Sequence, residues 1–82
     1  MHILVNHQIS DADAYWNALH ANPPVPEGFK VLTFMAGTDP GESACLWSAP
    51  DVDSLKALVD KTVGHASSNN YMVINDTKSF GI

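Results

Sequence analysis

The chain has 82 residues, of which 45% are hydrophobic and only 16% are charged, and its formal net charge is −5. This length fits a single small domain, and a surface so poor in charge suggests that a partner covers part of it. The only basic side chains apart from histidine are four lysines. Nucleic acids and anionic membranes both require clustered cations, so neither is expected as a partner.

The cysteine count and the hydropathy pattern narrow the class of protein further. Cys45 is the only cysteine, so the chain is expected to form neither an internal disulfide nor a thiolate metal cluster. The sequence has no apolar run of about 18 residues that would span a membrane, and no basic-then-apolar leader for export. A cytoplasmic protein is therefore expected.

The first half of the chain predicts a strand, a helix and a second strand. An apolar strand around residues 3–5 leads into Ser10-Asp11-Ala12-Asp13, in which the serine can cap a helix and the later aspartate favours its positive end. The helix is predicted over residues 11–21, and Pro23 and Pro24 follow it as breakers. Its buried stripe comprises Ala12, Tyr15, Trp16 and Leu19. The second strand is predicted over residues 29–36.

The second half repeats this order. A strand over residues 43–49 leads into Ser48-Ala49-Pro50-Asp51 and then a helix over residues 50–63, which Gly64 ends. The buried stripe of this helix comprises Val52, Leu55, Val59 and Thr62. The glycine-rich turn at residues 37–42 predicts a hairpin, and a last strand is predicted over residues 70–76.

Two consecutive β-α-β units predict an α+β, ferredoxin-like split βαβ domain covering residues 1–82. In this fold a four-stranded antiparallel sheet carries two helices on one face and leaves the other face open.

Strand alternation divides the sheet residues between these two faces. The side facing the helices is predicted to hold Ile3, Val5, Leu32, Phe34, Ala44, Leu46, Met72 and Ile74. The open side is predicted to hold Leu4, Asn6, Val31, Thr33, Cys45, Trp47, Tyr71, Val73 and Asn75. A shift of one residue in any strand would exchange its two rows. A face bearing large aromatic rings should not remain in water, so a homodimer closed sheet to sheet around a polar-lined cavity is expected.

Several short stretches resemble small bacterial proteins of the dimeric α/β-barrel superfamily. They are His7-Gln8-Ile9-Ser10-Asp11, Tyr15-Trp16, Pro26-Glu27-Gly28 and Cys45-Leu46-Trp47-Ser48-Ala49-Pro50. Within the superfamily the chain is most similar to short actinobacterial proteins, and more distantly to a nickel-binding group. The resemblance implies a dimeric barrel. It does not imply one activity, because the superfamily includes monooxygenases, polyketide cyclases, isomerases, haem-degrading enzymes and binding proteins.

The topology predicts which polar residues meet at a site. The end of the first strand should bring His7 near His65, with Tyr71 and Asn6 at the mouth of the dimer cavity. His7 and Tyr71 are the catalytic candidates, because a histidine near neutral pKa can move a proton and a phenol can donate to an oxyanion. Helix capping and interface packing are the structural alternatives for these two residues.

The candidate ligand-binding residues are Asn6, Thr33, Trp47 and Cys45. Cys45 is expected to behave as a small buried hydrophobe with a raised pKa, because the sequence predicts no base beside it.

Three functions are compatible with these residues. The first is binding of a small hydrophobic ligand between sheet faces, with cofactor-independent chemistry of cyclase, isomerase or monooxygenase type on a polyketide-like or other carbonyl substrate. The second is a non-enzymatic nickel or zinc protein that uses His7 and His65 as ligands. The third is a dimerisation module without chemistry.

Overall fold

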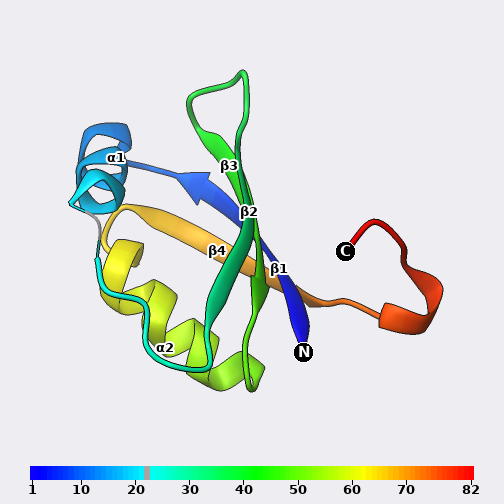
Figure 1. The fold of residues 1–82 in the computed structure, drawn as a ribbon. Coiled ribbons are helices and arrows are strands. Elements are labelled where there is room, and N and C mark those ends of the chain that lie inside the picture. Colours follow the sequence, from blue (N-terminus) through cyan, green and yellow to red (C-terminus); the bar gives the residue numbers. More distant parts are fainter. Residues whose placement is uncertain (22) are drawn as a thin grey trace.

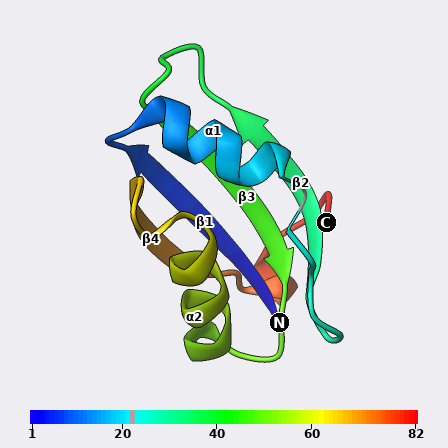
Figure 2. The ribbon, with the colours of Figure 1, turned by 90° about the vertical axis from the view of Figure 1, so that its left-hand side faces the viewer.

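The computed structural model describes residues 1–21 and 23–82, and its strands form one four-stranded antiparallel sheet in the order β2-β3-β1-β4. The strands are β1 (His2–Ile9), β2 (Lys30–Ala36), β3 (Glu42–Ser48) and β4 (Ser67–Val73). The helices are α1 (Ala12–His20), α2 (Val52–Val63) and a short 3-10 turn, η1 (Asp76–Lys78). Both long helices lie on the same side of the sheet (Figures 1 and 2). The predicted ferredoxin-like split βαβ fold is confirmed.

Aspartates cap both helices. The Asp11 carboxylate accepts a hydrogen bond from the backbone N–H of Ala14 at 3.1 Å, and Asp51 accepts one from Ser54 at 2.7 Å. Ser10 instead donates its hydroxyl to the carbonyl of Ala66 at 3.1 Å. The prediction that Ser10 and Ser48 cap the two helices is therefore wrong, because Asp11 and Asp51 occupy the cap positions. A carboxylate at the cap both accepts from the orphan N–H groups and complements the helix dipole.

The predicted hairpin between β2 and β3 is confirmed, with one irregularity. A bulge interrupts the pairing between Val31 and Thr33, so that Val31 pairs with Trp47 while Phe34 pairs with Cys45. Because ladder partners point to the same side of a sheet, Val31 and Phe34 lie on one face although they are three residues apart. The alternation predicted for this strand, with Val31 opposite Phe34, is wrong for this reason.

The core lies between the sheet and the helices, and the predicted helix stripes face it. Ile3, Val5, Tyr15 and Leu55 are fully buried. Neither α1 nor α2, within the part of the chain that the structure describes, is long and apolar enough to cross a lipid bilayer.

The predicted faces of β3 and β4 are exchanged in the structure. Val5 pairs with Cys45 on one side and with Tyr71 on the other, and Ile3 pairs with Trp47 and Val73. All four partners therefore share the helix-covered side with the buried Ile3 and Val5. Ala44, Leu46 and Met72, predicted to face the helices, belong to the open side. Both rows of β3 are apolar, so hydrophobicity alone could not select between the two registers.

The open face combines apolar and amide side chains. Leu4 and Leu46 are partly buried there, whereas Met35 and Met72 are 46% and 53% exposed. Around them, a shallow hollow near the hairpin is lined in part by Asn6, Gln8 and Asn70. This face lacks the aromatic side chains that the sequence predicted for it.

Candidate functional site

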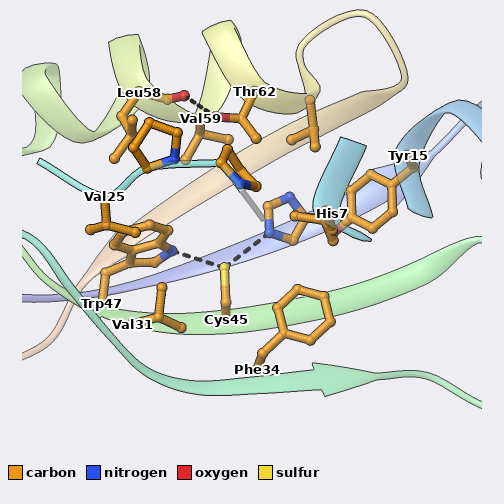
Figure 3. A pocket seen from close by; sticks show the side chains of 14 residues that line it. His7, Tyr15, Val25, Val31, Phe34, Cys45, Trp47, Leu58, Val59 and Thr62 are labelled. Carbon is orange, nitrogen blue, oxygen red and sulfur yellow. Dashed lines mark hydrogen bonds between the residues drawn. The ribbon is translucent and has the colours of Figure 1, made fainter. Parts of the chain in front are cut away.

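A cavity of about 180 Å³ lies between the sheet and the helices, on the covered side. β1, β2 and β3 supply its floor and α2 supplies one wall (Figure 3). Pro23, Pro24 and Val25, in the segment that follows α1, also line it. An engineered cavity of about 150 Å³ in another protein is large enough to bind benzene. The space therefore suits a ligand of one small ring.

The wall of the cavity is almost entirely apolar. From the strands come Val31 and Phe34, and from α2 come Leu58, Val59, Thr62 and Val63. The Thr62 hydroxyl is already bonded, because it donates to the carbonyl of Leu58 at 2.8 Å. The remaining polar groups gather at one place on the floor, where Trp47, Cys45 and His7 stand in a row (Figure 3).

These three side chains and Asn69 form a directional chain of hydrogen bonds. The indole Nε1 of Trp47 lies 3.0 Å from Cys45 Sγ, and Sγ lies 3.1 Å from His7 Nε2. On the other side of the ring, His7 Nδ1 lies 2.5 Å from Asn69 Oδ1. We call Trp47, Cys45, His7 and Asn69 the relay.

The chemistry of the end groups fixes the direction of the relay. Asn69 Oδ1 can only accept, so His7 Nδ1 carries the proton and Nε2 is left as the acceptor for the Cys45 S–H. The indole N–H of Trp47 can only donate, so it points its proton at the sulfur. Cys45 therefore stands between a hydrogen-bond donor and a base.

Burial keeps the relay uncharged at rest. Desolvation lowers the pKa of His7 below its ordinary value, against the smaller raising effect of the Asn69 bond. Desolvation also raises the pKa of the Cys45 thiol to about 11, although the Trp47 bond opposes it. The resting pair at neutral pH is thus a thiol and a neutral imidazole, the protonation state in which His7 can accept a proton.

Neighbouring titratable groups do not disturb this state near neutral pH. Tyr15 packs on His7 with ring centroids 5.6 Å apart, and burial raises the pKa of its hydroxyl. Burial raises the pKa of Tyr71 to about 12, and the nearby Asp60 and Cys45 add to this. Both phenols therefore stay neutral. Among the described residues, the titratable groups that line the cavity are His7, Tyr15 and Cys45.

The other predicted site residues are divided between the two faces. Asn6 and Thr33 lie on the open side, away from the relay, because Thr33 pairs with Leu46 and Asn6 with Ala44. Tyr71 lies on the helix side, where the Lys56 ammonium sits 5.5 Å from the centroid of its ring, but it is not part of the cavity lining. Trp47, Cys45 and Tyr71 therefore do not lie on the open face, where the sequence predicted them. The contact between His7 and Cys45, which the sequence did not predict, lies on the helix-covered side.

The predicted convergence of His7 with His65 has no counterpart in the described residues. His7 is 4% exposed and engages both ring nitrogens, whereas His65 is exposed in the turn after α2. Within residues 1–21 and 23–82, no group of three or more His, Cys, Asp or Glu side chains is placed to hold a metal ion.

Asn69 is the relay residue that the sequence did not indicate. The polar run Ser67-Ser68-Asn69-Asn70 has low strand propensity, so the last strand was expected to begin at residue 70. It begins at Ser67, and its register sets Asn69 directly opposite His7.

Comparisons with protein families, with curated proteins and with solved structures give no match for this chain. The resemblance to the dimeric α/β-barrel superfamily therefore stays a prediction.

Proposed function

We propose that the protein binds a small, uncharged, apolar ligand of about one ring in the cavity between α2 and the sheet. The observation that carries this proposal is the apolar cavity lining with its polar groups gathered at one point of the floor. Binding pockets commonly combine apolar contact area with a few convergent polar groups that orient the ligand. The site differs from the sheet-to-sheet cavity expected from the sequence.

Toluene is a suitable probe, and the indole N–H resonance of Trp47 in a proton–nitrogen NMR spectrum is a suitable reporter. Trp47 lines the cavity, so titration with toluene should shift its indole signal in a saturable way. Trp16, outside the cavity lining, is the internal reference.

Two equally exposed valines provide a matched pair of variants. Val25 is 49% exposed and lines the cavity, whereas Val73 is 50% exposed on β4 and does not line it. Val25→Phe should reduce toluene affinity by at least about tenfold, because the larger side chain would fill part of the cavity that Val25 lines, and Val73→Phe should not change it. A toluene-insensitive Trp47 signal, or equal binding by both variants, would overturn the proposal.

Dimerisation remains part of the proposal, through a different set of residues. The open face exposes Met35 and Met72 around the partly buried Leu4 and Leu46, and a second copy would remove these side chains from water. Light scattering on the native protein tests this directly, because a monomer at micromolar concentration would contradict it.

The nickel or zinc alternative is less well supported than ligand binding. His7 would have to release either Asn69 or Cys45 to offer a nitrogen to a metal. The chain has a single cysteine and so needs no internal disulfide, which fits a reducing compartment, and we therefore retain the cytoplasm as the proposed location.

A further inference from the structure

We infer that Cys45 is a nucleophile activated by His7, and that it adds covalently to a small, uncharged, unsaturated carbonyl compound held in the cavity. This inference rests on the proposed function, because the electrophile must enter the same apolar space. Cys45 is not an isolated cysteine. Its thiol contacts both the His7 imidazole and the Trp47 N–H, and the Asn69 amide orients the imidazole.

The geometry satisfies the requirements for an activated nucleophile. The base lies 3.1 Å from the sulfur, and a third group, Asn69, holds the base in the tautomer that leaves Nε2 free to accept. Asn69 is therefore a positioning residue. The pairing of Val5 with Cys45 and of His7 with Asn69 places these groups on three adjacent strands, so their relative positions are set by the sheet.

The Trp47 indole supplies the remaining element. As the thiol loses its proton, negative charge develops on the sulfur of a residue that is only 4% exposed. The Trp47 N–H, 3.0 Å from Sγ, is already oriented toward that charge. This hydrogen bond satisfies the indole N–H in the resting protein, and it would also stabilise a developing thiolate.

The lining of the cavity selects the class of electrophile. Among the described residues the lining holds no lysine, so an anionic ligand would lack a counter-ion there. Acyl transfer requires N–H donors at a separate oxyanion position, and the Trp47 N–H is already engaged by the sulfur. Conjugate addition has no leaving group, and its enolate is neutralised by the proton that His7 has taken from the thiol.

The addition balances without any further reactant. Sγ forms a bond to the β-carbon of the unsaturated carbonyl compound while the carbon–carbon π bond breaks, and the thiol proton passes to His7 Nε2. The resulting enolate then takes that proton from Nε2 at its α-carbon. His7 returns to its neutral form, and the product is a thioether that contains every atom of both reactants.

N-Ethylmaleimide, an uncharged conjugate acceptor, provides the test. Because Cys45 is the only cysteine, one added mass per chain reports its modification without ambiguity. A thiol with a pKa of about 11 is only about one part in 10⁴ thiolate at pH 7, so a rate limited by free thiolate should rise about tenfold per pH unit between pH 7 and 9. If His7 accepts the proton, the rate should instead be nearly constant over this range.

Two histidine variants distinguish the loss of the base from an unspecific effect of replacing a histidine with glutamine. His7→Gln should lower the rate at pH 7 by about 10²-fold and restore the tenfold rise per pH unit. His65→Gln makes the same change at an exposed position and should behave as the native protein. A tenfold rise per pH unit in the native protein would overturn the inference, and that measurement needs no variant to fold.

Competition by toluene distinguishes this inference from the proposed function. If toluene shifts the Trp47 signal but the rate of N-ethylmaleimide addition to the native protein rises tenfold per pH unit, the cavity binds ligands and Cys45 is not activated. If the native rate is constant with pH but toluene neither binds nor slows it, Cys45 is activated and the proposed apolar ligand site is wrong. Slowing of a pH-independent reaction by toluene supports both.

Discussion

Tyr15 and Tyr71 both lie on the helix-covered side, and replacing each with phenylalanine should change the free energy of unfolding in opposite directions. The hydroxyl of Tyr15 lies 2.6 Å from Ser43 Oγ, and both residues are buried. The buried hydroxyl of Tyr71 has no hydrogen-bond partner among the described residues. Tyr15→Phe and Tyr71→Phe each remove one oxygen atom, so the sign of each effect depends on whether that oxygen has a hydrogen-bond partner.

The magnitudes follow from the partners left behind. Tyr15→Phe leaves the hydroxyl of Ser43, which is 7% exposed, without its bond, and should lower the free energy of unfolding by about 1–3 kcal/mol. Tyr71→Phe removes a desolvated hydroxyl that gains nothing in return, and should raise the free energy of unfolding by up to about 1 kcal/mol. For a domain of this size, 1 kcal/mol corresponds to about 4–8 °C in Tm.

Urea unfolding followed by circular dichroism measures both effects, with unchanged m-values showing that stability alone has changed. Adding Ser43→Ala to Tyr15→Phe should recover most of the loss, because removing both partners leaves no unsatisfied group. A loss of more than about 1 kcal/mol in Tyr71→Phe would refute the reasoning, since it would mean that the Tyr71 hydroxyl has a partner.

Two further predictions concern His7 and the two sheet faces. Burial lowers the pKa of His7. Below about pH 6.5, His7 therefore binds a proton in the unfolded chain but stays neutral in the folded one. As the pH is lowered through this range, the free energy of unfolding should fall by up to about 1.4 kcal/mol per pH unit. Urea midpoints between pH 8 and 5 should show this slope in the native protein and a smaller one in His7→Gln, and equal slopes would count against it. Leu46→Glu should convert the proposed dimer to a folded monomer in light scattering, whereas Trp47→Glu should unfold the domain by placing a charge under the helices. A folded, monomeric Trp47→Glu protein would reverse our assignment of the faces.

The fold could be predicted from the sequence because its signals are local. Helix stripes such as that of Leu55 and Val59, and the glycine-rich turn between β2 and β3, depend on spacing and on turn chemistry within a few residues. These features fix the order of elements, and the order of elements implies the topology.

The site could not be predicted because it depends on strand register. Sequence alternation shows that Cys45 and Trp47 share a face, but not which face, since Ala44 and Leu46 are equally compatible with burial. The partnership of His7 with Asn69 depends on where β4 begins, and a polar segment gives no hydrophobic signal for this. The sequence did not predict that His7 lies beside Cys45, because this contact depends on the registers of β3, β1 and β4.

The relay and the cover of the cavity are held in place by different kinds of interaction. By the roof we mean α2 and the segment from Pro23 to Val25, which line the cavity opposite the sheet. Trp47, Cys45, His7 and Asn69 stand on strands whose backbones are joined by ladder hydrogen bonds, while α2 and the segment from Pro23 to Val25 are packed above them. A local opening that lifts the roof would therefore admit a ligand without breaking any ladder bond beneath it. Access to the cavity and alignment of its reactive groups can thus change independently, so substitutions in the roof can alter which molecules enter while the chemistry at the floor stays the same.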